Sequence, residues 1–205
     1  MIEQGTDEWH TLRLGKVTAS QIVNVMMKPD AAGFQNYRAQ LVCERLTGRA
    51  TETFKSAAMQ HGNDTEPQAR AMYTMTTGRM VEQIAFVDHP LIAMAGCSPD
   101  GLVGELGMIE VKCPQPTEHI RTVLGGSIKR PYALQMQWQM ACTGREWCDF
   151  VSFCPDLPDE LALHVERVAI DHDAIRDMER AVSEFLAEVD QTVAALRARY
   201  TQEAA

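Results

Sequence analysis

The sequence lacks the features that mark several large classes of protein. No apolar run approaches the length needed to cross a bilayer, so we expect no membrane partner. The first eight residues are acidic and polar, without the basic and apolar regions of a secretory signal. The six cysteines contain no CxxC pair, which argues against a zinc site. These absences favour a protein of a reducing cytoplasm.

A basic excess is also missing. The chain has 19 Lys and Arg against 28 Asp and Glu, for a net charge of −9. Because duplex-binding domains usually carry a positive excess, the overall charge argues against a nucleic-acid partner. A nuclease can still carry its positive field locally, through bound metal and a few arginines. The acids gather in residues 1–8 and 156–190, and we expect both regions to lie away from DNA.

The length and the hydrophobic pattern predict one domain, residues 1–205, of mixed α/β class with one central sheet. The expected helices cover about residues 20–27 after a cap at Thr18 or Ser20, 35–47, 56–76, 117–124, 131–143 and the last 30 residues. The expected strands are 81–87, 92–95 and 108–111, as a meander, then 148–153 and 161–170. Glu66-Pro67 suggests a fresh helical start inside 56–76. The last helix carries a long apolar stripe, which we expect to pack on the core.

A turn and a strand in the middle of the chain bring acids and a lysine together. The turn at residues 98–101 contains Asp100, and the apolar run at 108–111 contains Glu110 and leads into Lys112. Side chains alternate along a strand, so Glu110 and Lys112 share one face. Two carboxylates beside an ammonium suit a divalent metal and a phosphate. Taken alone, Glu110 and Lys112 could equally form a surface ion pair, and Asp100 could be an ordinary turn residue.

Five stretches of the chain resemble, in order, the phage lambda exonuclease family of phage-type alkaline exonucleases. They are residues 9–20, 95–101, 110–114, 124–126 and 135–138. The family belongs to the restriction-endonuclease-like nucleases, which share a Pro-Asp…Glu-x-Lys pattern. The resemblance therefore implies a restriction-endonuclease-like core, with a central mixed β-sheet flanked by α-helices and a long C-terminal helix.

The pattern assigns roles to the central residues. Asp100 and Glu110 are the expected metal ligands, with the backbone carbonyl of Val111 as a third. Lys112 would orient the attacking water or stabilise the developing charge, as a compact point charge whose pKa falls on burial. The expected cofactor is Mg²⁺, with two ions per site, and the same oxygen ligands would accept Mn²⁺.

The resemblance adds further candidates for the metal site. Glu66 would lie beside the metals, although an exposed ion pair with Arg70 would also explain it. Asp88, or else His89, would fill an acidic position upstream of the turn, unless Asp88 is only a turn residue. Gln137 would contact the attacking water or the scissile strand.

The resemblance also assigns a substrate end. Arg13 and Ser20, at an expected helix start, would hold the 5′-terminal phosphate. A surface arginine and a capping serine are the plainer interpretation of the same two residues.

The function that follows is a Mg²⁺-dependent 5′-to-3′ exonuclease, a deoxyribonuclease acting on linear double-stranded DNA with a 5′-phosphate. It would release 5′-mononucleotides and leave 3′ single-stranded overhangs for recombination. The resemblance implies a single-strand annealing protein as partner, a homotrimer, and the cytoplasm of a bacterium or a phage-infected cell. One alternative is an iron–sulfur exonuclease of the same fold, for which the cysteine spacing is wrong. Another is a non-catalytic DNA-binding or assembly protein that retains the nuclease fold.

Overall fold

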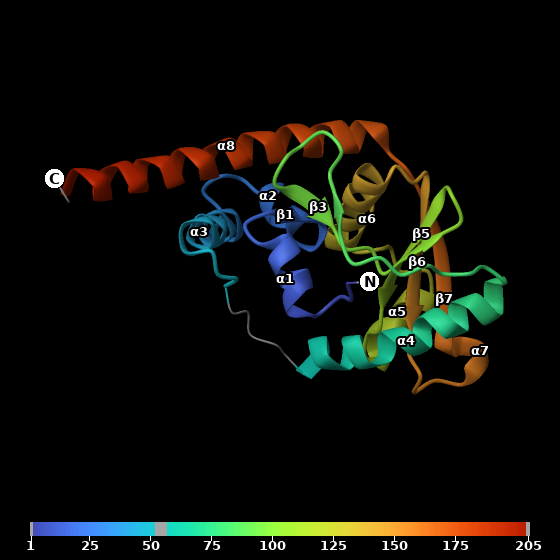
Figure 1. The fold of residues 1–205 in the computed structure, drawn as a ribbon. Coiled ribbons are helices and arrows are strands. Elements are labelled where there is room, and N and C mark those ends of the chain that lie inside the picture. Colours follow the sequence, from blue (N-terminus) through green and yellow to red (C-terminus); the bar gives the residue numbers. More distant parts are fainter. Residues whose placement is uncertain (1, 52–56, 204–205) are drawn as a thin grey trace.

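The computed structural model describes residues 2–51 and 57–203, in the arrangement that Figure 1 shows. The helices are α1 (Asp7–Arg13), the 3₁₀ turn η1 (Ala19–Gln21), α2 (Ile22–Val25), α3 (Ala32–Thr47), α4 (Ala57–Thr77), α5 (Pro116–Val123), α6 (Arg130–Thr143), α7 (Asp159–Ala162) and α8 (His172–Glu203). The strands are β1 (Val17–Thr18), β2 (Val87–Asp88), β3 (Ala95–Cys97), β4 (Gly101–Val103), β5 (Gly107–Lys112), β6 (Trp147–Phe153) and β7 (Leu163–Ala169). Within this described part of the chain, no helix is both long and apolar enough to span a bilayer.

The main sheet has the strand order β4-β5-β6-β7. Strands β5 and β6 run parallel, and the other two pairs are antiparallel, so the sheet is mixed. The alternation along β5 divides its side chains between two layers. Ile109 and Val111 pack with Ala69 and Tyr73 of α4 on one face, and Met108 packs with α6 on the other. The predicted mixed α/β class with helices on the sheet is therefore confirmed.

The predicted single sheet with a three-stranded meander is wrong, because a second sheet is present with the order β1-β3-β2. Strand β3 belongs to this smaller sheet and β4 to the main sheet, and the turn between them contains Pro99. Proline has no N–H group for a ladder and so ends the pairing there. The expected strand at 81–87 is reduced to β2 and an isolated bridge from Glu82 to Leu102.

The predicted helices are present, with differences near Thr18 and Pro67. Two short helices, α1 and α7, were not predicted, and α7 includes the start of the strand expected at 161–170. Thr18 ends a strand, because β1 pairs in parallel with β3, and the helix that follows is only η1 and α2. Helix α4 continues through Pro67, where a fresh start was expected. Proline costs one helical hydrogen bond, and the full burial of Ala69 and Tyr73 just beyond it offsets that loss. The expected start of this helix at Ser56 lies outside the described residues.

Helix α8 confirms the predicted C-terminal helix and its apolar stripe. It lies along one side of the molecule and packs on α2, α3 and α6 (Figure 1). Phe185 on this stripe contacts Phe34 edge-on, at 4.9 Å between ring centroids, and stacks on Tyr37 at 5.6 Å. Its buried residues are Ile175, Met178, Val182, Phe185, Leu186, Val189 and Val193, and Leu196 packs against the same core.

Candidate active site

The C-terminal end of β5, an interior strand of the main sheet, holds an ion pair. Glu110 is fully buried on the α6 side of the strand, and the ammonium of Lys112 forms an ion pair with its Oε1. The Lys112 Nζ atom also lies 4.9 Å from the centroid of the Tyr132 ring. Burial alone would lower the pKa of Lys112, but the charges of Glu110 and Asp100 outweigh it and raise that pKa. The expected fall of the lysine pKa is therefore wrong.

Asp100 is held beside Glu110 by the pairing of the two strands that follow it. Gly101 pairs with Ile109 in the β4–β5 ladder, which brings the turn against β5. The backbone N–H of Val111 then donates to Asp100 Oδ2 at 2.7 Å. Burial raises the pKa of Asp100 well above its usual range, and the negative charges of Glu110 and Glu66 raise it further. The structure thus brings together the acid of the turn and the acid of the strand, as predicted.

Glu66 reaches the same place from α4. Its carboxylate pairs with Arg70 one turn along the helix, and both side chains line a cavity together with Asp100. Burial raises the pKa of Glu66, against the attraction of Arg70, and Glu110 raises it further. The ion pair with Arg70 and the position beside the other acids are both present, so neither interpretation of Glu66 excludes the other.

This group of side chains is chemically suited to a divalent cation. Three carboxyl groups, of Asp100, Glu110 and Glu66, lie beside two cations, Lys112 and Arg70, in a desolvated place. Oxygen donors of this kind are those that Mg²⁺ prefers. Among the described residues, no three His, Cys, Asp or Glu side chains are already arranged around a common point. The carboxylates instead turn toward Lys112, Arg70 and the Val111 N–H.

The glutamine that contacts this group is Gln139 rather than Gln137. Gln139 is fully buried, and its Nε2 donates to Glu110 Oε2 at 2.8 Å. The Gln137 amide is used elsewhere, because Nε2 donates to the Ala169 carbonyl and Oε1 accepts from the Asp171 N–H. The predicted contact of Gln137 with the site is therefore wrong. Residues two apart on a helix point in different directions, so Gln137 and Gln139 could not both face Glu110, and the sequence carried no signal that favoured Gln139.

Asp88 and His89 do not fill the upstream acidic position. Asp88 is exposed on β2 and forms an ion pair with Lys16 at 2.6 Å. His89 is buried against Trp138, with 4.8 Å between ring centroids, and its Nδ1 accepts from the backbone of Leu91 and Ile92. Neither residue lines the cavity that Asp100 and Glu66 share. Asp88 is not a turn residue either, because it pairs with Gly96 in the β2–β3 ladder and the chain bends only after it.

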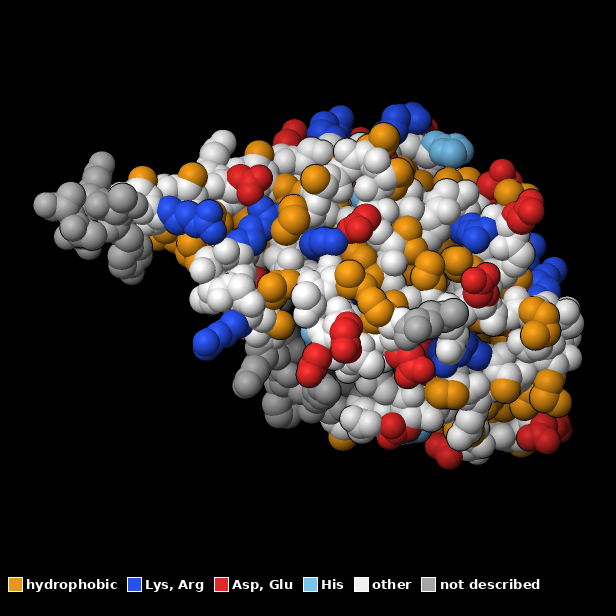
Figure 2. All heavy atoms as spheres, in the orientation of Figure 1, with side chains coloured by type: hydrophobic (Ala, Val, Ile, Leu, Met, Phe, Trp, Pro, Cys, Tyr) orange, Lys and Arg blue, Asp and Glu red, His pale blue; other side chains and the backbone are white. Residues whose placement is uncertain are grey.

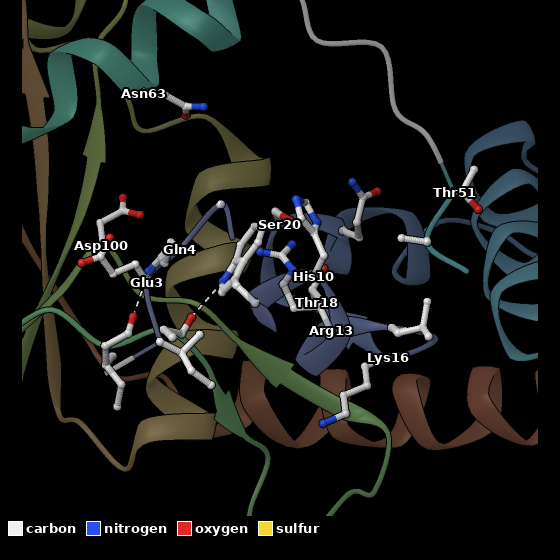
Figure 3. A pocket seen from close by; sticks show the side chains of 18 of the residues that line it. Glu3, Gln4, His10, Arg13, Lys16, Thr18, Ser20, Thr51, Asn63 and Asp100 are labelled. Atoms are coloured by element: carbon white, nitrogen blue, oxygen red, sulfur yellow. Dashed lines mark hydrogen bonds between the residues drawn. The ribbon is translucent and has the colours of Figure 1, made fainter. Parts of the chain in front are cut away.

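The cavity beside the acids extends to Arg13 and Ser20 and has a volume of about 930 Å³. Figure 3 shows Asp100 on one side of it and Arg13, His10, Thr18 and Ser20 on the other. The Arg13 guanidinium lies 4.0 Å from the centroid of the Trp9 ring, and burial lowers its pKa, although nearby Tyr37, Cys97 and Glu44 oppose this. The structure thus places Arg13 and Ser20 in one cavity with two of the acids.

The helix expected at this end is weaker than the sequence suggested. Thr18 precedes η1 without a side-chain cap, and its N–H donates to the Tyr37 hydroxyl at 3.1 Å. A 3₁₀ turn of three residues has almost no macrodipole, so Arg13 carries most of the positive charge here.

The first residues lie closer to the site than predicted. Residues 1–8 were expected away from DNA, yet Glu3 and Gln4 line the cavity near Asp100 (Figure 3). Figure 2 shows acidic and basic side chains interspersed over one face of the described residues, rather than gathered in a basic stripe. Positive charge suited to a phosphate is therefore local, at Arg13, Arg70 and Lys112.

Comparisons with known proteins agree on one family. Residues 8–146 match the model of the YqaJ-like viral recombinase domain. An alkaline exonuclease from Laribacter hongkongensis is 48% identical, with 96% of this chain and 99% of that chain aligned and a TM-score of 0.91. Its structure in complex with dAMP superposes equally well, with a TM-score of 0.90. A search of curated protein sequences gives no match.

A more distant structure shares the fold alone. A phage-related exonuclease from Haemophilus somnus aligns over 91% of this chain and 99% of its own, with 14% identity and a TM-score of 0.71. The arrangement of sheet and helices is thus common to exonucleases whose sequences have diverged widely.

Proposed function

Because the chain belongs to the family of YqaJ-like viral recombinase domains and is a DNA exonuclease, we propose that it degrades one strand of linear duplex DNA from a 5′-phosphate. The observation that supports this is the cavity of about 930 Å³. It joins the acids at Asp100 and Glu66 to the guanidinium of Arg13. A strand end held at Arg13 would present its first internucleotide phosphate to the acids.

The donor set fits Mg²⁺, with Mn²⁺ as the alternative. Asp100 and Glu110 would hold the ions, with Glu66 and the backbone carbonyl of Val111 as further oxygen donors, and two ions per site are expected. Bound Mg²⁺ supplies positive charge to the phosphate and makes water a better nucleophile. Burial, and then the charges of Glu110 and Glu66, raise the pKa of Asp100, and a bound cation would offset this.

Lys112 and Gln139 have separate tasks at Glu110. The ammonium of Lys112, which is paired with Glu110, would act as a donor to the water or the phosphate. Gln139 holds the other oxygen of Glu110 and fixes the direction of the carboxylate. Each oxygen of Glu110 thus has one partner from the protein and keeps a further lone pair that a metal ion would use.

Arg13 and Ser20 would bind the terminal phosphate at the other end of the cavity. A guanidinium and a hydroxyl provide several donors for phosphate oxygens. This preference for a 5′-phosphate sets the polarity, with 5′-mononucleotides released and a 3′ single-stranded overhang remaining. The related alkaline exonuclease in complex with dAMP supports a nucleoside monophosphate as product.

The remaining proposals follow the family resemblance. A single-strand annealing protein would receive the overhang, three copies of the chain would encircle the duplex, and the reaction would take place in the cytoplasm. These proposals are independent of the chemistry at the acids.

The function is tested with linear duplexes labelled at either the 5′ or the 3′ end, in Mg²⁺ and in EDTA. We expect labelled mononucleotide at once from the 5′-labelled duplex, slow release from the 3′-labelled one, and none in EDTA. Glu110→Gln, which is nearly the same size, serves as the inactive control. Immediate release of the 3′ label, or degradation in EDTA, would contradict the proposal.

A further inference from the structure

Gln4 connects two loops of the molecule near the candidate site. Its Nε2 donates to the carbonyl of Ile84 at 2.9 Å and to the carbonyl of Pro99 at 2.9 Å. Both partners are carbonyl oxygens, so the group that faces them must be the amide nitrogen. The side chain of an exposed residue thus uses both of its N–H groups on the backbone.

Trp9 connects the same two loops a short distance away. Its indole Nε1 lies 3.0 Å from the Ala85 carbonyl and 2.9 Å from the Ser98 hydroxyl. Gln4 and Trp9 therefore both join residues 84–85 to residues 98–99. Thr6 lies between Gln4 and Trp9 and stiffens this segment. Its hydroxyl donates to the Glu3 carbonyl at 2.8 Å and accepts from the backbone N–H of Trp9 at 3.3 Å.

The turn at residues 98–101, which they hold, contains Asp100 and contacts Arg13 of α1, and these two residues line opposite ends of the cavity. Asp100 directly follows Pro99, whose carbonyl Gln4 binds. Arg13 lies over the Trp9 ring and has its Nη1 3.5 Å from the Ser98 hydroxyl. Asp100 and Arg13 are thus positioned through neighbouring residues of one short turn.

We propose that Gln4 and Trp9 are positioning residues that fix the spacing between Arg13 and Asp100, and so set the length of the released product. The inference rests on the proposed function, in which Arg13 holds the 5′-phosphate and Asp100 serves the hydrolysed bond. With the spacing rigid, only the first internucleotide phosphate reaches the acids, and one nucleotide leaves at a time. With the turn loosened, the second phosphate gains access.

The test uses two conservative variants. Gln4→Glu keeps the shape but removes both donors, and places a carboxylate against two carbonyl oxygens. Trp9→Phe keeps an aromatic ring under Arg13 but removes the indole N–H. Gln191→Glu, an exposed change on α8, is the matched control. Products from a 5′-labelled duplex in Mg²⁺ are separated by length, and Tm is measured for each variant.

We expect Gln4→Glu and Trp9→Phe to release dinucleotide as well as mononucleotide, while Gln191→Glu releases mononucleotide only. The rate should fall about 10- to 100-fold, because a displacement of the order of 1 Å costs that much. The double variant should lose less than the product of the two single losses, since both residues act on one turn.

The outcomes separate this inference from the function on which it rests. If the parent protein does not release mononucleotide from 5′ ends, the proposed function fails. If the parent does so and both folded variants release mononucleotide only, at whatever rate, the spacing role of Gln4 and Trp9 is wrong. Release of dinucleotide by either variant with Tm near that of the parent supports it.

Discussion

Replacing Gln139 is the sharpest test of the site, because the change should affect the stability of the protein little and its activity strongly. Its Nε2 donates to Glu110 Oε2 at 2.8 Å, and a hydrogen bond to a charged group contributes about 1.5–3 kcal/mol. Its Oε1 is buried without a hydrogen-bond partner among the described residues, and an unsatisfied acceptor costs about 1–3 kcal/mol. Gln139→Met removes both terms, so the free energy of unfolding should change by only about 1 kcal/mol. For a domain of this size Tm should move by about 2–4 °C.

Activity should respond far more strongly. Without Gln139, Lys112 is the only side-chain partner that Glu110 keeps among the described residues, so the carboxylate can rotate. A misdirected carboxylate should lower the single-turnover rate of cleavage by about 10- to 100-fold. The measurement is single-turnover cleavage of a 5′-phosphorylated duplex in Mg²⁺, beside a thermal melt of the same preparation.

Gln137→Met is the matched control for this change. Gln137 lies on the same helix but bonds to the backbone at Ala169 and Asp171. Its loss should cost about 1–3 kcal/mol of stability for two broken hydrogen bonds and leave the rate nearly unchanged. The reverse pattern, with Gln139→Met active and Gln137→Met inactive, would refute our assignment of the two glutamines.

Three further predictions concern the acids, the lysine and the phosphate end. The pKa of Asp100 is raised in the folded protein, so its stabilising contribution is present below the unfolded pKa of about 4 and is lost as pH rises through the folded value. Asp100→Asn should therefore raise Tm at pH 8 in EDTA. The same variant should not cleave duplex DNA in Mg²⁺, and added Ca²⁺ should not raise its Tm. A Tm in EDTA below that of the parent would contradict this. Lys112→Ala should lower single-turnover cleavage by about 10²-fold or more, with duplex binding in Ca²⁺ retained. Near-normal cleavage would remove Lys112 from the mechanism. Arg13→Ala should reduce the preference for 5′-phosphate over 5′-hydroxyl ends, by up to about 1.5–3 kcal/mol; equal parent rates on both ends would count against the pocket.

Most of the helices and strands could be predicted from local patterns in the sequence. The stripe of α8 and the glycines that end α3 and α4 are local signals, and the positive φ of Gly48 and Gly78 explains both helix ends. The alternation along β5 likewise put Glu110 and Lys112 on one face, and the contact between them agrees. Such features depend on residues a few positions apart, which a single sequence displays directly.

Pairings between distant segments were decided only in three dimensions. The split into two sheets at Pro99 depends on which strands meet, and β1 pairs with β3 across more than seventy residues. Similarly, the position of Asp88 in the sequence suggested a metal ligand, yet its side chain is exposed on β2 and pairs with Lys16. A carboxylate is chemically suited to bind a metal, but Asp88 does not line the cavity that Asp100 and Glu66 share.

The functional contacts show the same division. The sequence by itself predicted a group of candidate residues, Asp100, Glu110 and Lys112 in one pattern with Arg13 upstream, and the structure brings the first three together. Only the tertiary structure decided that Gln139 and not Gln137 faces Glu110, and that Gln4 lies on the turn of Asp100. A motif specifies side chains that sit close along the chain, whereas the direction of a helix face and the docking of a distant segment depend on packing against the whole core.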